Sequence, residues 1–241
     1  MLQTENGTLI FVTDDDGDGI SNTGSLVVST DNGETWARRG HSSTTPDSLR
    51  IAGLHAAVVE AADVNNDGRN DLLAIARDAG KYYAGKAPKS ISTDGGKTWQ
   101  HSPSVFPSIK SGQRFTVLRL RYSKVANANN SKGPILFTGF ANDSIRAKNI
   151  EGKLDEISGL YAALSFDEGK TWPENFRKVI SNVQGAQAME ITMAPWQRKS
   201  TLTRTNGQKE GYMSVTQTPD GMIFLTDGKM VYSFNLAWLI N

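Results

Sequence analysis

The stretch Ser92–Trp99 reads STDGGKTW, and the same pattern of Ser, Asp, Gly, Thr and Trp recurs at Ser29–Trp36 and Ser165–Trp172. The copies begin 63 and 73 residues apart and hold three of the five tryptophans in the chain. Each residue type suits a tight turn between strands, because Asp bonds to backbone N–H groups, Gly adopts a positive φ and Trp fills the space beside the turn. The repeat therefore predicts three hairpin turns of one kind and an all-β fold.

Runs rich in β-branched and aromatic residues, bounded by Gly, Asn, Asp or Pro, fill the intervals between the copies. No segment has the length and periodicity of a long amphipathic helix. The expected strands are Thr8–Thr13, Ser25–Ser29, Leu54–Glu60, Asp71–Arg77, Lys89–Ser92, Phe115–Arg121, Pro134–Phe140, Leu160–Ser165, Gly211–Thr216, Met222–Thr226 and Met230–Asn235.

The repeated stretch resembles the Asp-box, or BNR repeat, of sialidase-like β-propellers. This resemblance implies blades of four antiparallel strands arranged around an axis. The expected strands make about four blades, whereas a sialidase propeller has six. Residues 1–241 are therefore expected to form a single sialidase-like propeller domain, an arc that lacks the first two blades. Open edges of such an arc expose sheet faces, so self-association through them is a further expectation.

Composition excludes several classes of protein. The chain has 241 residues, of which 38% are hydrophobic and 21% charged, as is typical of a globular protein. The absence of cysteine excludes a disulfide scaffold, a thiolate zinc site and a cysteine nucleophile. A net charge of +1 argues against a nucleic-acid binder, and no apolar stretch approaches the roughly 18 residues of a membrane span. No signal peptide is visible at the N-terminus, although the resemblance implies a secreted or periplasmic protein.

Two acidic loops have the spacing of calcium ligands. One follows the pattern D-x-D-x-D-G, and the other follows D-x-N-x-D-G-x-x-D. Alternate oxygen-bearing side chains beside a glycine turn suit Ca²⁺, which takes 6–8 oxygen ligands. A solvated acidic turn is the alternative, since Asp, Asn and Gly favour turns in any case. The expected ligands of a structural Ca²⁺ are Asp14, Asp16 and Asp18 in the first loop and Asp63, Asn65, Asp67 and Asp71 in the second.

The stretch after the second Asp-box closely resembles the sialidase superfamily in the order of its elements. Gly112–Arg119, Gly133–Gly139, the third Asp-box and Gly211–Gly221 carry this resemblance, which runs from about Leu49 to Leu239. It is closest to bacterial BNR-repeat sialidase-like proteins. Enzymes of the superfamily use a tyrosine nucleophile, a glutamate that activates it, an aspartate acid/base and three arginines that bind a carboxylate.

Four positions can be compared with this family pattern. Tyr212 matches the nucleophilic tyrosine, and Arg77 matches one carboxylate-binding arginine. His55 stands where the family has the activating glutamate, and Ile157 stands where it has another arginine.

The residue types also suggest chemistry directly. A histidine near a tyrosine could take the phenol proton, because its unperturbed pKa of about 6.5 lies near neutral pH. Arg114, at the head of an expected inner strand, could bind a sugar carboxylate in a bidentate manner. Glu190 is a spare carboxylate that could serve as an acid/base. Arg119 and Arg121 alternate on a strand and are expected to form a solvated face.

Three functions stay open on this basis. The first is hydrolysis of an acidic glycan by a sialidase-like exo-glycosidase, with Tyr212, His55 and Glu190 catalytic and Arg77 and Arg114 binding substrate. The second is a uronate-directed polysaccharide lyase that uses the same residues for β-elimination. The third is a propeller that binds carbohydrate without catalysis.

Overall fold

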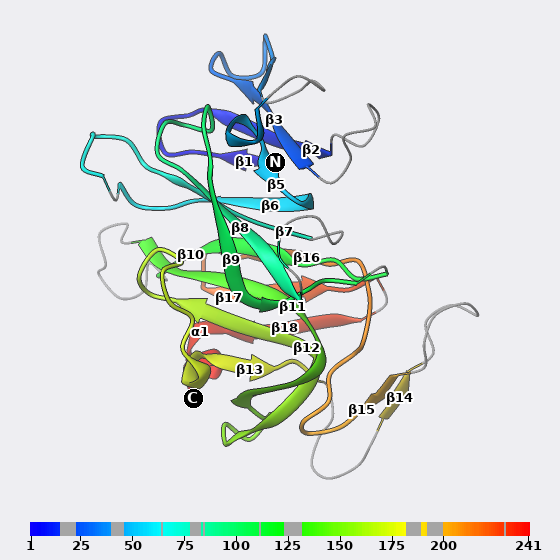
Figure 1. Cartoon of the computed structure of the whole chain (residues 1–241). Helices are drawn as coiled ribbons and strands as arrows, with labels where there is room; N and C mark the ends of the chain where they lie inside the picture. Colours follow the sequence, from blue (N-terminus) through cyan, green and yellow to red (C-terminus); the bar gives the residue numbers. More distant parts are fainter. Residues whose placement is uncertain are drawn as a thin grey trace. The chain divides into compact units, whose positions relative to one another are not determined.

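The structure is a computed structural model of the whole chain (Figure 1). It describes residues 1–14, 23–39, 46–63, 65–77, 83, 85–110, 112–122, 132–181, 189–191, 200–228 and 230–241, with the backbone alone at 189–191. The chain divides into two compact units, Met1–Ser108 and Ile109–Asn241. Each unit is built from sheets in which most neighbouring strands are antiparallel and consecutive in sequence, so the predicted all-β fold is confirmed.

The first unit contains two sheets. The first has the order β1 (Leu2–Gln3), β2 (Leu9–Asp14), β3 (Thr23–Ser29) and β4 (Ala37–Arg39), and β5 (Ile51–Ala52) also pairs with β3. The second comprises β6 (Leu54–Glu60), β7 (Leu72–Arg77), β8 (Lys86–Ser92) and β9 (Gln100–Pro107). Aliphatic side chains from facing strands of both sheets make one core, which buries Ile10, Leu26, Val28, Ile51, Leu72, Ala74, Ala76 and Trp99.

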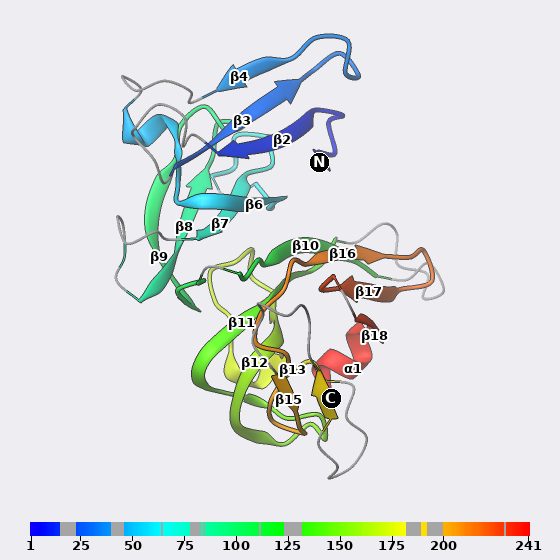
Figure 2. The ribbon, with the colours of Figure 1, turned by 90° about the vertical axis from the view of Figure 1, so that its right-hand side faces the viewer.

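The second unit repeats this plan. One sheet comprises β10 (Thr116–Arg121), β11 (Lys132–Lys148), β12 (Leu154–Ser165) and β13 (Arg177–Val179); the other comprises β16 (Ser214–Gln217), β17 (Met222–Thr226) and β18 (Val231–Asn235). The short strands β14 (Met189–Ile191) and β15 (Ser200–Leu202) pair separately, and helix α1 (Leu236–Ile240) follows β18. Strands β10 and β16 lie side by side (Figure 2), and the core between the two larger sheets includes Leu120, Leu160, Ile223 and Leu225.

The expected inner strands are all present, within a few residues at their ends. The sequence failed to predict the outermost strands β4, β9 and β13, which follow the Asp-boxes. Strand β9 carries Pro103 and Pro107, which favour an edge position and lack the N–H of a central strand. The outer half of the β11–β12 hairpin was also missed, because its sequence is polar and does not read as a strand.

The three Asp-boxes share one set of hydrogen bonds. In each, the serine Oγ donates to Asp Oδ1 (2.7, 2.8 and 2.7 Å at Ser29, Ser92 and Ser165) and accepts from the N–H of the turn glycine (2.8, 2.7 and 2.8 Å). The threonine N–H then donates to the same Asp Oδ1, at 2.9, 2.8 and 2.8 Å, and the threonine hydroxyl donates to Oδ2. One carboxylate therefore closes each turn, as the repeat predicted.

The two residues after each box aspartate adopt positive φ values. Glycine fills the second of these places in every copy, with φ of 92° at Gly33, 85° at Gly96 and 78° at Gly169. The first place is occupied by Asn32, Gly95 and Glu168, so two non-glycine residues accept a left-handed conformation. The box aspartate accepts hydrogen bonds from the serine before these residues and from the threonine after them. These bonds offset the cost of the left-handed conformation.

The hydrogen bonds lower the pKa of the box aspartates. The pKa of Asp31 falls to about 2, chiefly because the Thr35 hydroxyl donates to its carboxylate. For Asp94 and Asp167, burial raises the pKa, but the bonds from threonine and serine outweigh it and the net direction is down.

We expect this pKa shift to appear as acid sensitivity. A carboxyl whose folded pKa lies below its unfolded value of about 3.9 stabilises the fold above that pH, and the contribution is lost as the pH falls toward about 2. In Asp31→Asn, stability measured by urea unfolding should therefore fall less steeply across this window than in the wild type. Thr35→Val should raise the Asp31 pKa measured by NMR; an unchanged value would contradict the assigned cause.

Candidate functional site

Two of the predicted site residues, Arg114 and Tyr212, lie together in the second unit. The guanidinium carbon of Arg114 lies 4.4 Å from the centroid of the Tyr212 ring, and Nη2 donates to the phenol oxygen at 3.4 Å. The Tyr212 side chain is well exposed, with a relative accessibility of 58% for the residue. A cation and a phenol are thus presented to solvent from segments 98 residues apart in the chain.

A short parallel bridge brings these two segments together just before β10 and β16. Gln113 pairs with Gly211; the Gly211 N–H donates to the Gly112 carbonyl at 3.1 Å, and the Arg114 N–H donates to the Gly211 carbonyl at 2.9 Å. Gly211 permits a close approach, because a Cβ there would lie 2.7 Å from the Asp227 carbonyl oxygen. A larger residue at Gly211 would therefore displace the strand that carries Tyr212.

The buried side chain of Gln113 anchors the bridge. Its Nε2 donates to Asn142 Oδ1 at 2.8 Å and to the Lys209 carbonyl at 2.7 Å, and its Oε1 accepts from the Lys110 N–H at 2.9 Å. The Arg114 guanidinium is fixed in turn by a 2.8 Å bond from Nη1 to the Gln113 carbonyl. Arg114 is therefore held by its own strand before any ligand arrives.

Glu210 is a further carboxylate at this place, which the sequence reasoning missed. Side chains alternate between the two faces of paired strands, so Glu210 shares a face with Arg114 and Tyr212, while Gln113 points to the other side. Glu210 is nine-tenths buried, and its Oε2 lies 3.0 Å from where a Cβ of Gly112 would be. The sequence held only part of this signal, because Glu and Tyr two residues apart share one strand face, whereas only the bridge places Gly112 opposite Glu210.

A second tyrosine, Tyr232, is buried near this segment beside the buried Gln208. Tyr232 donates to Gln208 Oε1 at 3.5 Å, and the Gln208 amide donates to the Glu210 carbonyl at 2.7 Å. Burial raises the pKa of the Tyr232 phenol, and the neighbouring Asp227 carboxylate raises it further. Tyr232 is therefore held neutral, whereas Tyr212 is the tyrosine of this segment that a substrate can reach.

In the first unit, His55 pairs with Asp14. The Asp14 Oδ2 lies 2.5 Å from the ring Nδ1, and Oδ1 accepts the His55 backbone N–H, also at 2.5 Å. This contact occupies Nδ1, so Nε2 is the ring nitrogen that lies outside it. Asp14 thus has a partner that its predicted role as a calcium ligand did not foresee.

His55 also has an unusual backbone. It lies in a bulge of β6 and has a φ of 51°, one of four non-glycine residues described with positive φ. Such conformations are costly and concentrate at functional sites, so the observation favours a role for His55. Its neighbour Leu54 pairs with Arg77 at the end of β7, so the structure places His55 and Arg77 at one end of the same sheet.

The Asp63–Asp71 loop is closed by its own hydrogen bonds. Asp63 accepts the N–H groups of Asp67 and Gly68 at 3.1 and 2.8 Å, and Asn65 Oδ1 accepts the Asp67 N–H at 3.3 Å. Asp71, in contrast, is fully buried. In the part of the chain that the structure describes, no three His, Cys, Asp or Glu side chains converge as metal ligands. The loop as described is thus not a ready ligand set, and calcium stays a prediction.

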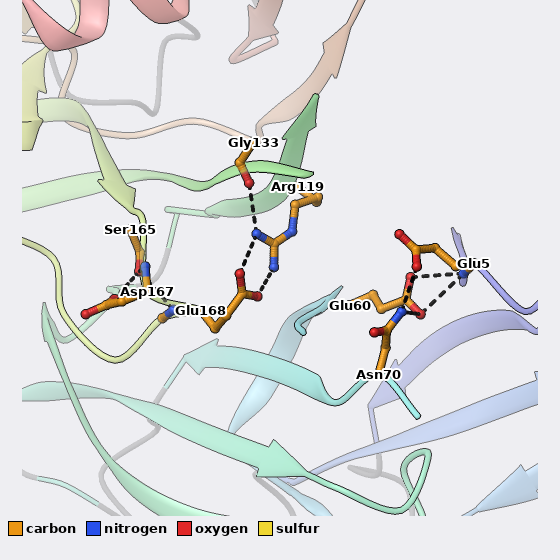
Figure 3. A network of polar contacts seen from close by, with 9 residues as sticks. Glu5, Glu60, Asn70, Arg119, Gly133, Ser165, Asp167 and Glu168 are labelled. Carbon is orange, nitrogen blue, oxygen red and sulfur yellow. Dashed lines mark hydrogen bonds and ion pairs between the residues drawn. The ribbon is translucent and has the colours of Figure 1, made fainter. Parts of the chain in front are cut away.

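Asn70, at the end of this loop, ties it to the β1–β2 turn (Figure 3). Its amide donates to Glu5 at 2.9 Å and to Glu60 at 3.0 Å, and the Glu60 carboxylate accepts the Glu5 N–H at 3.0 Å. The other expected calcium ligands, Asp16 and Asp18, lie outside the described residues, as does the side chain of Glu190. The predicted roles of Asp16, Asp18 and Glu190 therefore stay predictions.

The prediction that Arg119 belongs to a solvated face is wrong. Arg119 forms a two-pronged ion pair with Glu168 in the turn of the third Asp-box, and its Nη1 also donates to the Gly133 carbonyl at 2.9 Å (Figure 3). The arginine therefore fastens the box turn to strand β10. Arg121 is exposed, as expected. Ile157, where the family has an arginine, is fully buried and pairs with Ile145, so this place contributes to the core.

Comparison with known families agrees with these observations. The model described as BNR/Asp-box repeat matches residues 27–38 and 90–101. The third copy, Ser165–Trp172, makes the same hydrogen bonds as the two that match. A comparison with curated proteins finds no significant match. None of the described helices is long and apolar enough to cross a membrane. The chain thus carries Asp-box repeats on antiparallel sheets of the β-propeller type, as in sialidase-like Asp-box propellers.

Proposed function

We propose that this protein binds an acidic glycan at Arg114 and Tyr212 and cleaves it by glycoside hydrolysis, as a sialidase-like exo-glycosidase. The observation that carries the proposal is the exposed pair itself, in which the guanidinium of Arg114 lies 4.4 Å from the Tyr212 ring centroid. The Asp-box repeats and the blade sheets support the same class of protein.

In this proposal, the second unit supplies a binding group, a nucleophile and a base. Arg114 offers a planar fork to a sugar carboxylate, and this interaction fixes the ring beside the phenol. The Tyr212 oxygen attacks the anomeric carbon and loses its proton to a carboxylate, for which Glu210 on the same face is the candidate. The bond to the leaving oxygen breaks, and that oxygen takes up a proton from the protonated carboxylate through a water molecule. A second water then hydrolyses the tyrosyl glycoside, adding its hydroxyl to the sugar and its proton to the Tyr212 oxygen.

The first test is turnover of glycosides with a terminal acidic sugar, measured by release of a fluorogenic leaving group. The matching neutral glycoside is the control and should not react. Arg114→Gln should raise KM roughly 10- to 100-fold, because a charged bidentate contact contributes about 1.5–3 kcal/mol. Arg121→Gln changes an exposed arginine outside the pair and should leave KM unchanged. Equal KM values in the two variants would remove Arg114 from the substrate site.

The Asp14–His55 pair favours a second candidate, a uronate lyase. In that reaction, His55 Nε2 removes the C5 proton, the electron pair forms the C4–C5 double bond, and the C4–O bond breaks while its oxygen takes a proton from water. Arg77, at the same end of the sheet, would neutralise the carboxylate. The product is an unsaturated uronate, which absorbs in the ultraviolet. Its appearance would favour the lyase over the hydrolase, and glycan binding without either product would favour a non-catalytic module.

Calcium is a separate proposal, with a structural role only, at the Asp63–Asp71 loop. Binding to the folded state alone would add about 2.7 kcal/mol at a concentration 100 times the Kd. The melting temperature should then fall on chelation with EDTA and recover with added Ca²⁺. Asp63→Asn should abolish this response, and identical melts with and without EDTA would reject the proposal.

We also propose a secreted or periplasmic location, which cell fractionation of the source organism tests.

A further inference from the structure

The segment that leads to Tyr212 is largely buried, although it lies outside any strand. Between β15 and β16, its buried residues are Gly207, Gln208, Glu210 and Gly211. Buried backbone N–H and C=O groups need hydrogen-bond partners, and a segment outside the sheets must find them elsewhere. The partners that it finds therefore decide where the Glu210 and Tyr212 side chains lie.

The peptide group between Glu210 and Gly211 is held at both ends. Its carbonyl accepts from Gln208 Nε2 at 2.7 Å. Its N–H donates to the Gly112 carbonyl at 3.1 Å, and the next carbonyl along the chain accepts from the Arg114 N–H at 2.9 Å. A peptide group is planar and rigid, so holding two of them in succession fixes where the side chains on either side begin.

The Gln208 amide is oriented by its surroundings. Gln208 is fully buried, and its Oε1 accepts from the Tyr232 hydroxyl at 3.5 Å. The reversed amide would place Oε1 against the Glu210 carbonyl oxygen, so that two acceptors would face each other. Burial and the Asp227 carboxylate raise the pKa of Tyr232, so the phenol keeps the proton that it donates. The amide is thus oriented from the Tyr232 side and holds the Glu210 peptide on the other.

We propose that Gln208 is a positioning residue of the candidate site, a role that rests on the proposed function, in which Glu210 takes the proton of Tyr212. Of the three bonds that hold the two peptide groups, the Gln208 bond comes from a side chain, and the other two come from the backbone. Because Gln208 is fully buried, it acts through the Glu210 peptide and does not touch the substrate. It keeps the Glu210 carboxylate in place relative to the Tyr212 phenol.

The test compares Gln208→Leu with the wild type in turnover of a fluorogenic acidic glycoside. Loss of the amide should lower kcat roughly 10- to 100-fold, because a shift of about 1 Å in a catalytic group can cost a factor of about 100. KM should change little, since the Arg114 guanidinium is fixed by its own bond to the carbonyl before it. A structural role alone would lower the amount of folded protein and leave kcat per folded molecule unchanged.

Gln217→Leu is the matched control, because Gln217 also bonds through its amide to a backbone peptide. Its Oε1 accepts the Arg121 N–H at 2.7 Å and its Nε2 donates to the Arg121 carbonyl at 3.1 Å, at the end of β16 that lies away from Tyr212. This variant should lose stability without the fall in kcat. Gln208→Glu should regain turnover relative to Gln208→Leu as the pH falls, because a protonated carboxyl can again donate to the Glu210 carbonyl.

Amide hydrogen exchange separates this role from the proposed reaction. The Gly211 and Arg114 N–H groups should exchange several-fold faster in Gln208→Leu than in the wild type or in Gln217→Leu. Such exchange supports the positioning role even if the wild type turns over no acidic glycoside, a result that would end the proposed function alone. Gln208→Glu at neutral pH carries the same comparisons if Gln208→Leu does not fold. Equal kcat and equal exchange in the Gln208 and Gln217 variants would overturn the proposal.

Discussion

Replacing Tyr212 by Phe is expected to lower turnover of the acidic glycoside roughly 1,000-fold or more, while substrate binding is kept. The change removes only the phenol oxygen, which is the proposed nucleophile, and nucleophile and base act as a unit in such reactions. The ring that lies under the Arg114 guanidinium stays in place, so KM should change little. The measurement is kcat and KM with a fluorogenic acidic glycoside, alongside the melting temperature of each variant.

Two comparison variants make this result specific. Tyr122→Phe alters an exposed tyrosine elsewhere in the second unit and should leave turnover unchanged. His55→Gln should abolish activity if the protein is a lyase that uses the Asp14–His55 pair as its base. Loss of activity in Tyr212→Phe with retention in His55→Gln assigns the chemistry to the second unit. Full activity of Tyr212→Phe would remove Tyr212 from the mechanism.

The largest effect on stability is expected at a pair of glycines that lie back to back. A Cβ on Gly159 would lie 2.3 Å from the Gly207 carbonyl oxygen, and a Cβ on Gly207 would lie 2.5 Å from the Leu160 carbonyl oxygen. The Gly207 N–H donates to Ser158 at 2.9 Å, and the Leu160 N–H donates to Gln208 at 2.7 Å. This close approach fixes the segment that leads to Glu210 and Tyr212.

Gly159→Ala should therefore cost about 3 kcal/mol or more and lower the melting temperature by roughly 6–12 °C. Gly85→Ala is the matched control, because Gly85 has nearly the same φ (75° against 77°) but nothing within 4 Å of its Cβ position. The difference between the two variants isolates the close approach from the strain of the left-handed backbone. Equal losses of stability would show that the contact between the two segments is not tight.

The sequence was sufficient for the turns and the inner strands, because their residues act locally. The box aspartate, serine and threonine bond within eight residues, and apolar runs such as those of β7 and β17 have few alternatives to a buried strand. The outer strands were not predicted, since Pro103 and Pro107 in β9 read as breakers unless the position of the edge is known.

The candidate site was predictable only in part. Tyr212 and Arg114 were identified by residue type and resemblance, but the bridge between Gln113 and Gly211 joins segments that no local pattern relates. Glu210 was missed for the same reason, because its face is defined by the glycine opposite it at Gly112. The Arg119–Glu168 ion pair likewise joins residues 49 positions apart, and strand alternation alone assigned Arg119 to solvent.

The hydrogen bonds that close the Asp-box all lie within the repeat, so the repeat can be duplicated along a chain as a unit. Every donor and acceptor that closes the turn is encoded within eight consecutive residues, so a duplicated copy needs no matching change elsewhere to form. The stretch can thus be inserted between two new strands and still form the same turn. The second box packs against Leu26 of the neighbouring sheet, and the first box makes the same bonds although Trp36 is exposed, so three copies can persist among otherwise dissimilar segments of one polypeptide.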